Sequence, residues 1–225
     1  MSEINEDIIG VFVSKPRPTG PKAVMSAIHK NQVAKLIVHK ETLDGDDSYD
    51  KRFHGGPYRV IHHYTQKNYE RLKLKFPEIA DKFKGGSYGE NLLTENLDES
   101  DFCIGDIFQA GTSTLELTIP RSPCGTINMG YEHNKVLKEI ISTGHFGWFY
   151  RIIKEGEIKV GDKLKLIERP NPVANLHKLI KSAYKIKKSE ISNIDKNFLV
   201  KTKCIDSLDN EWVEKIDKTL KLFES

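Results

Sequence analysis

Short apolar segments separated by polar turns fill the first three quarters of the chain. Several of these segments alternate between apolar and polar residues with a period of two, which is typical of half-buried strands. The segments cover residues 8–14, 32–39, 59–64, 107–110, 114–119, 148–153 and 163–167. Glycine and aspartate mark the turns, as in Gly105-Asp106 and Gly161-Asp162. This spacing predicts a mainly β protein, either a barrel or a sandwich.

Two segments with helical periodicity interrupt the strands. Thr65 is suited to cap a helix over residues 66–76, and Pro77 then ends that helix because proline cannot continue it. A second helix is predicted over about residues 135–142, where it stops before Gly144. We therefore expect helical insertions within the β framework.

The pattern changes after the sequence Arg169-Pro170-Asn171-Pro172. Each proline disfavours helical geometry in the residue before it and cannot donate to a sheet ladder, so this run predicts a boundary. From Val173 onward apolar residues recur at helical spacing, which predicts about three short helices. We expect a β domain over residues 1–170 and a helical extension over residues 171–225.

Composition and charge narrow the class of protein. Hydrophobic residues make up 38% and charged residues 30% of 225, so the chain can bury a full core and disorder is excluded as its global state. Residues 1–169 hold 24 basic and 24 acidic side chains, and the net charge of +3 comes from the 11 lysines and 8 acids that follow. This surplus is too diffuse for a nucleic-acid partner. The acidic N-terminus, without a run of about 20 apolar residues, predicts a cytoplasmic protein with no membrane partner.

The three cysteines are Cys103, Cys124 and Cys204. An odd number at wide separations, with no C-x-x-C pair, argues against a disulfide framework and against a zinc knuckle. Free thiols fit a reducing compartment, and we interpret Cys103 and Cys204 as structural.

Cys124 is the strongest candidate for chemistry. It ends the run Pro120-Arg121-Ser122-Pro123-Cys124, which follows a predicted strand. The prolines fix φ at their positions and Arg121 brings a cation close, a setting that favours the thiolate, which attacks electrophiles and binds soft metals. A buried, inert cysteine is the alternative, and the loop alone leaves both interpretations open.

A second candidate site surrounds two adjacent glycines, Gly55 and Gly56. Glycine lets backbone amides approach a ligand closely, and the flanking side chains suit an anion: Lys51, Arg52, His54 and Arg59. The segment lacks both the Walker A pattern and G-x-G-x-x-G, so nucleotide binding is not indicated. A glycine-rich turn with solvated cations remains an equal alternative.

The histidines do not predict a metal site. His62 and His63 are neighbours on a predicted strand, so their side chains point to opposite faces and cannot easily share a metal. Taken alone, Glu90-Asn91 after the glycine cluster at 85–89 also reads as a turn.

Several of these motifs in this order resemble the molybdenum cofactor sulfurase C-terminal (MOSC) domain family, and within it a YiiM-like subgroup with a three-helix C-terminal extension. The resemblance covers about residues 8–169 and rests on ordered motifs, which are His54-Gly55-Gly56-Pro57, Gly89-Glu90-Asn91-Leu92, Gly105-Asp106, Pro120-Arg121-Ser122-Pro123-Cys124, and Thr143-Gly144 with Gly147-Trp148.

The resemblance implies a closed β-barrel that binds the molybdenum cofactor (molybdopterin), with Cys124 as the metal ligand. A thiolate is a soft ligand suited to such a metal. By the same resemblance, the cradle for the cofactor phosphate or the pocket wall comprises Lys51, Arg52, His54, Gly55, Gly56 and Arg59. Arg121 is expected beside the metal loop, and Glu90 and Asn91 are expected to line the site.

The resemblance further implies an oxidoreductase that reduces N-hydroxylated compounds, such as 6-hydroxylaminopurine, to amines in a detoxification role that does not depend on pyridoxal phosphate. In the implied reaction, R–NHOH takes up two electrons and two protons and gives R–NH2 and water. Glu90 or His54 is the candidate proton donor. Since the chain lacks a dinucleotide fingerprint and an iron–sulfur cysteine pattern, a separate reductase must supply electrons. A homodimer is possible. The residues Gly125-Thr126 after the cysteine differ from the pattern of the subgroup, and this difference bears on substrate preference.

Two alternatives to a molybdenum reductase stay open. The chain could carry a molybdenum cofactor or sulfur to another enzyme without catalysing turnover. It could also be a metal-free thiol enzyme in which Cys124 is the nucleophile and His54 its base, although no nucleophilic spacing of cysteine, histidine and acid is visible.

Overall fold

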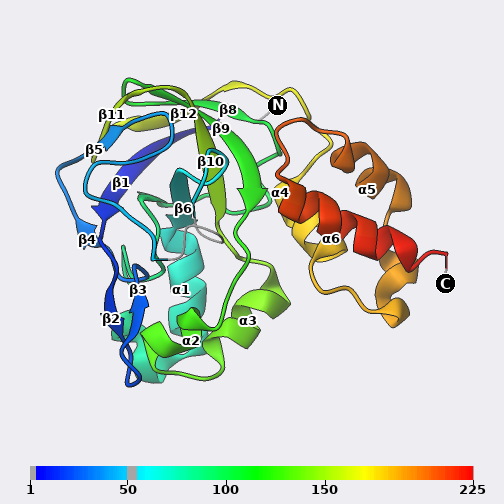
Figure 1. Ribbon diagram of the computed structural model, residues 1–225, viewed down its shortest axis with the longest axis horizontal. Coiled ribbons are helices and arrows are strands. Elements are labelled where there is room, and N and C mark those ends of the chain that lie inside the picture. The colour runs from blue at the N-terminus through cyan, green and yellow to red at the C-terminus, as the bar shows by residue number, and fades with distance from the viewer. Residues whose placement is uncertain (1–3, 50–54, 225) are drawn as a thin grey trace.

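The computed structural model describes residues 4–49 and 55–224 (Figure 1). Three residues of the predicted anion cradle, Lys51, Arg52 and His54, lie outside the described residues.

Among the described residues, seven strands close into a barrel of mixed direction. In barrel order they are β1 (Asn5–Val13), β12 (Lys163–Glu168), β8 (Ile107–Ala110), β9 (Ser113–Pro120), β10 (Trp148–Lys154), β6 (Ile61–Thr65) and β7 (Leu92–Thr94). The ring closes because β1 pairs antiparallel with both β7 and β12. Only the β6–β7 pairing is parallel within this ring of described strands. The closed β-barrel that the resemblance implied is confirmed.

The barrel interior is packed with aromatic side chains. Trp148, Tyr150 and Phe102 are fully buried there, and the His63 ring lies against all three. Both ring nitrogens of His63 have partners, at 2.9 Å from the Tyr150 hydroxyl and 2.9 Å from Thr94 Oγ1. His63 is therefore a core histidine with hydrogen-bond partners for both ring nitrogens.

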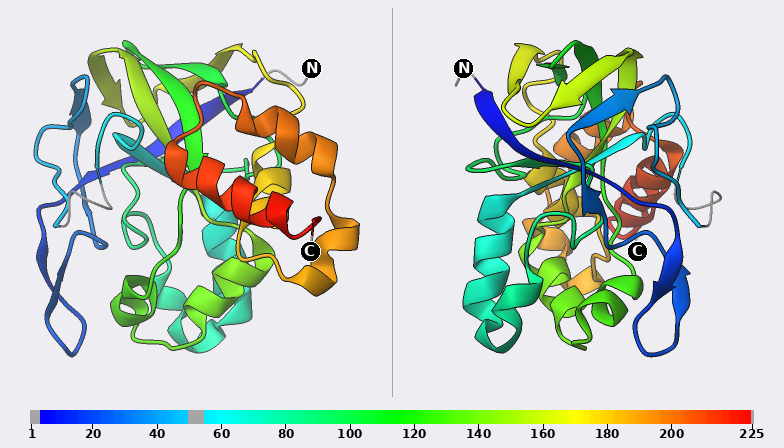
Figure 2. Two further views of the ribbon diagram at one scale, coloured as in Figure 1. Left: turned by 45° about the vertical axis from the view of Figure 1, so that its right-hand side comes forward. Right: turned by 90° about the vertical axis from the view of Figure 1, so that its left-hand side faces the viewer.

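Helices and small sheets cover the ends and sides of the barrel. Figures 1 and 2 show three helices gathered at one end, namely α1 (Gln66–Lys75), α2 (Thr126–Tyr131) and α3 (Val136–Thr143), with the 3-10 turn η1 (Pro77–Lys82) after α1. The smaller strands are β4 (Asn31–Gln32), which pairs with β1, the β2 (Arg17–Thr19) and β3 (Val24–Ser26) hairpin, and the pair β5 (Lys35–Val38) and β11 (Gly156–Lys159).

The predicted caps and ends of the helical insertions match the structure closely. Thr65 Oγ1 accepts a hydrogen bond from Asn68 N at the start of α1, and the helix ends just before Pro77. Helix α2 was not predicted, because its six residues are too few to show a helical period. It starts directly after the cysteine loop and buries Ile127 and Tyr131.

A helical extension follows the prolines at 170 and 172. Its elements are α4 (Leu176–Ala183), the 3-10 turn η2 (Lys188–Asn193), α5 (Lys196–Lys203) and α6 (Asn210–Lys221). Leu179 of α4 and Trp212 and Ile216 of α6 are fully buried, as the apolar spacing predicted. None of the helices in the described part of the chain has the length and apolar character needed to cross a bilayer.

A close backbone approach at Gly86 gives a test of this packing. Gly86 has φ of 82°, and a Cβ added there would collide with the carbonyl oxygen of Lys30. Gly161 has a similar φ of 90° but open space around the added Cβ. We expect Gly161→Ala to cost about 1 kcal/mol of unfolding free energy from φ alone, and Gly86→Ala at least about twice as much. Urea denaturation measures both, and equal losses would contradict the close approach.

Candidate functional site

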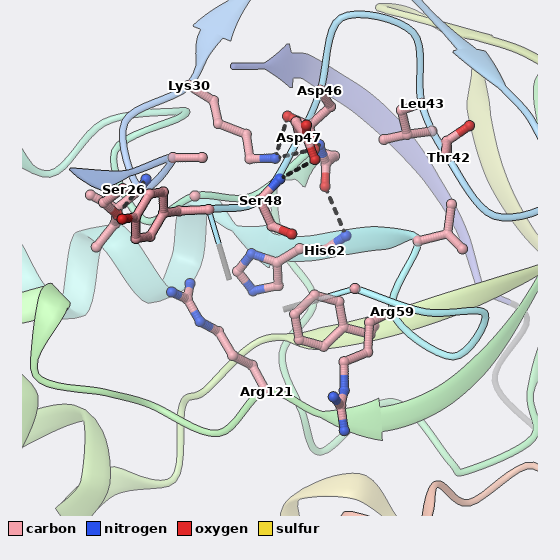
Figure 3. Close-up of a pocket in the computed structure, with 18 of the residues that line it drawn as sticks. Ser26, Lys30, Thr42, Leu43, Asp46, Asp47, Ser48, Arg59, His62 and Arg121 are labelled. Carbon is pink, nitrogen blue, oxygen red and sulfur yellow. Dashed lines mark hydrogen bonds and ion pairs between the residues drawn. The ribbon is translucent and has the colours of Figure 1, made fainter. Parts of the chain in front are cut away.

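A cavity of about 540 Å³ opens beside β6, and segments far apart in the sequence form its walls (Figure 3). One wall comes from residues 25–28 and Lys30 with residues 41–43 and 46–49, and another comes from Gly55, Gly56, Arg59, Val60 and His62. The cysteine loop closes a third side. The predicted site residues that line this cavity are Cys124, Arg121, Arg59, Gly55, Gly56 and Asn91.

Cys124 is a free, partly buried thiol at the cavity wall. Its Sγ lies 3.3 Å from Thr126 Oγ1, in the first turn of α2. The loop before it is tied to the barrel, since Arg121 N donates to the Gly147 carbonyl oxygen at 2.9 Å. The thiol is therefore accessible from the cavity on a backbone that is fixed on both sides.

Arg121 brings a positive charge into the same cavity. Its guanidinium carbon lies 4.1 Å from the centroid of the Tyr88 ring, and Nη1 donates to the Tyr88 carbonyl oxygen. Figure 3 shows the guanidinium reaching across the cavity beside the His62 ring. Stacking on Tyr88 holds the planar group in one orientation, as a site for an anion requires.

Arg59 lines the cavity with its stem while its guanidinium turns away from it (Figure 3). Its Nη2 lies 3.0 Å from Asp209 Oδ1 and 2.9 Å from Glu211 Oε2, both in the helical extension. These carboxylates compensate its charge. Arg121, expected beside the metal loop, is thus better placed than the cradle residue Arg59 to meet an anion in the cavity.

Glu90, predicted to line the site, lies outside the residues that form the cavity. Its fully buried carboxylate accepts hydrogen bonds from Gly86 N at 2.6 Å, the Tyr69 hydroxyl at 2.8 Å and Tyr88 N at 3.3 Å. Burial raises the pKa of Glu90, against the effect of these donors. In this structure the carboxylate holds the turn that presents Tyr88 to Arg121.

Asn91 and a buried ion pair form the polar floor of the cavity. Asn91 Oδ1 accepts from His62 N at 3.0 Å, and its Nδ2 donates to Phe12 O and to Asp46 Oδ2. Asp46 in turn lies 2.5 Å from Lys30 Nζ, with both side chains mostly shielded from solvent. Burial lowers the pKa of Lys30, although Asp46 opposes that shift. Sequence reasoning missed Lys30 and Asp46, because no local motif joins them.

His62 lines the cavity, although the sequence analysis assigned it no role in the site. It is 3% exposed, and its Nε2 has no hydrogen-bond partner among the described residues. Burial and then the charge of Arg121 hold the pKa of His62 well below 6.5, so the ring is neutral near pH 7. Strand alternation could have found it, since its neighbour His63 points into the core.

The donors around the cavity fit the molybdenum cofactor. A thiol suits a soft metal, and the Arg121 guanidinium and the Gly55-Gly56 backbone suit an anion. Gly56 has φ of 88°, and a Cβ added there would meet nothing within 4 Å, so the cradle is open at this point.

Comparison with known families identifies the class of protein. The family model of the MOSC domain matches residues 50–165, which is more than half of the 225 residues. The chain therefore belongs to the MOSC domain family.

Individual relatives agree with this assignment. The chain is 36% identical over 154 residues to Protein YiiM of Escherichia coli strain K12, covering 68% of this chain and 69% of that protein. It is also 36% identical over 163 residues to a protein named Reductase from Gibberella moniliformis, covering 71% of this chain but only 29% of that protein. The chain is thus a homologue of YiiM and spans under a third of the fungal relative.

Solved structures share the fold over nearly the whole chain, helical extension included. YiiM from Geobacillus stearothermophilus has a TM-score of 0.76 at 25% identity, covering 95% of this chain and 98% of that one. YiiM from Escherichia coli has a TM-score of 0.72 at 26% identity, covering 92% of each chain.

The buried imidazoles predict a pH dependence of stability. Burial lowers the pKa of His63 to about 3, whereas the unfolded chain takes up a proton near pH 6.5. The free energy of unfolding therefore has its full value above pH 6.5 and decreases as the pH falls, because the unfolded state binds a proton that the folded state does not. Between pH 8 and pH 5 we expect His63 to remove about 2 kcal/mol from the free energy of unfolding, with His62 acting in the same direction.

Urea denaturation across this pH range measures the loss. His63→Gln, which keeps a polar side chain without the titration, should give a shallower dependence than wild type. Identical pH dependence in the two proteins would show that His63 does not carry the effect.

Proposed function

We propose that the protein binds the molybdenum cofactor through Cys124 and reduces N-hydroxylated compounds, such as 6-hydroxylaminopurine, to amines. The observation that carries the proposal is that Cys124, Arg121 and the Gly55-Gly56 turn line one cavity. A soft metal ligand, a fixed cation and an amide-rich turn are the groups that a metal-bound, phosphate-bearing cofactor needs.

Each cavity residue has a separate task in this proposal. The Cys124 thiolate would hold the metal, while Arg121 and the amides at Gly55 and Gly56 would bind the phosphate-bearing part. When bound, the cofactor would supply the two-electron redox chemistry. The protein's contribution is then to orient, to bind and to deliver protons.

A side chain that donates protons to the substrate must lie beside the cavity. Glu90 is bonded to three donors outside the cavity lining, so it is a poor source of protons for a substrate there. We propose His54 instead, the residue before the cavity-lining Gly55. His62 is neutral and contributes a ring surface and one nitrogen to the wall.

Two further points support a reductive role. The Gibberella moniliformis relative carries the name Reductase. The chain itself lacks a dinucleotide fingerprint and an iron–sulfur cysteine pattern, so we propose that a separate reductase supplies the two electrons.

Metal content tests the role of Cys124 directly. Wild type, Cys124→Ala and Cys204→Ala are made in a host that synthesises the cofactor, and molybdenum per chain is measured by mass spectrometry. We expect wild type and Cys204→Ala, which changes an exposed free thiol, to bind molybdenum equally. Cys124→Ala should lose at least about nine tenths of the metal, because removal of a metal ligand costs well over 1.4 kcal/mol. Metal-free wild type, or full occupancy in Cys124→Ala, would overturn the proposal.

Turnover separates a reductase from a carrier. Molybdenum-loaded wild type with a chemical electron donor should convert 6-hydroxylaminopurine to the amine. A loaded protein that holds its metal but converts no N-hydroxylated compound would favour the cofactor carrier instead.

A further inference from the structure

The helical extension contacts the cysteine loop through directed hydrogen bonds. Trp212 Nε1, fully buried in α6, donates to the Pro120 carbonyl oxygen at 2.9 Å. Ser122 Oγ donates to Glu211 Oε1 at 2.5 Å. Figure 2 shows α6, in red, lying against the end of β9 from which this loop leaves.

A third contact comes from the end of α4. The Tyr184 hydroxyl donates to the Pro123 carbonyl oxygen at 3.2 Å, while its ring packs edge-on against Phe146. Three of the four residues before Cys124 are therefore bonded to the extension, and the remaining one, Arg121, is bonded to the barrel. Polar groups of a loop that are satisfied in this way leave its backbone little freedom.

Glu211 connects two walls of the cavity. Its carboxylate accepts from Ser122 in the cysteine loop and also pairs with Arg59 at 2.9 Å, from the segment that carries Gly55 and Gly56. Lys215, one turn further along α6, pairs with the same carboxylate. The contacts are shielded in part from solvent, with the Arg59 side chain 13% exposed and that of Glu211 35%.

We propose that the extension is the positioning element of the cysteine loop, in which Glu211 and Tyr184 set how far the Cys124 thiol is presented to the cavity. These two residues act through Ser122 and Pro123 and are positioning residues. The claim concerns the thiol itself, and only its catalytic meaning rests on the proposed function.

Thiol reactivity of the full-length, metal-free protein tests the proposal. Iodoacetamide labels the protein, and peptide mass spectrometry gives the alkylation rate of Cys124 relative to the exposed Cys204 in the same molecule. Ser122→Ala, Glu211→Ala and the double variant form a cycle, with Tyr184→Phe as a milder change that keeps the ring. The matched control is Glu214→Ala, an exposed glutamate of the same helix.

We expect Ser122→Ala and Glu211→Ala each to raise the relative rate at Cys124 about tenfold, which corresponds to about 1.4 kcal/mol of restraint on the loop. Tyr184→Phe should raise it less. The double variant should be no faster than the faster single variant, because both remove one shared contact. Ser122→Thr, which keeps the hydroxyl, and Glu214→Ala should stay within about twofold of wild type.

Unchanged rates in Ser122→Ala and Glu211→Ala would overturn the proposal. So would effects that multiply in the double variant, or a rise at Cys204 equal to that at Cys124, which would indicate general loosening. The result is independent of the metal measurement. If Cys124→Ala retains molybdenum, the proposed function is wrong, but the positioning of the thiol is still tested by these alkylation rates alone.

Discussion

A buried carboxylate, Glu99, fixes the turn on which the cysteine loop rests. Its side chain is fully buried, and a polar group in such a place is stable only when hydrogen bonds replace the lost water. His145 Nδ1 and Gly147 N each lie 2.8 Å from its oxygens, and Asn68 Nδ2 of α1 lies at 3.1 and 3.2 Å. The carbonyl oxygen of the same Gly147 accepts a hydrogen bond from Arg121 N. Helix α1, the start of β10 and the cysteine loop are thus joined through one side chain.

The loop is consequently held from two directions. The barrel fixes it through Gly147, and the extension fixes it through Trp212, Glu211 and Tyr184. A loop that must place a metal ligand to within a fraction of an ångström needs such support, because a loosely held ligand lowers the affinity for the metal. The cavity is therefore a product of both parts of the chain, although its lining comes from the barrel side of Pro170.

The sequence predicted the features that depend on local chemistry. The cap at Thr65, the end of α1 before Pro77 and most strands of the barrel follow from residue type and period, and the structure confirms them. The loop made Cys124 a candidate but left an inert, buried thiol open, and its place on the cavity wall is seen only in the folded chain.

The remaining features depend on contacts between distant segments, which no local pattern encodes. Lys30 and Asp46 meet on the cavity floor through pairing across 16 residues, and Arg59 turns towards carboxylates 150 and 152 residues away. The family resemblance placed Glu90 in the site lining, yet its carboxylate accepts hydrogen bonds from three donors outside the cavity. Whether such a side chain faces the cavity depends on its burial and on the positions of its hydrogen-bond partners, and both are set only when the chain folds.

The direct ligation of molybdenum by Cys124 is the claim on which the functional proposal stands. X-ray absorption at the molybdenum edge of the loaded, full-length protein counts the sulfur atoms around the metal, in wild type and in Cys124→Ser. We expect wild type to show one more sulfur neighbour than the serine variant, at a distance typical of a metal–thiolate bond. The same number of sulfur neighbours in both proteins would contradict ligation by Cys124.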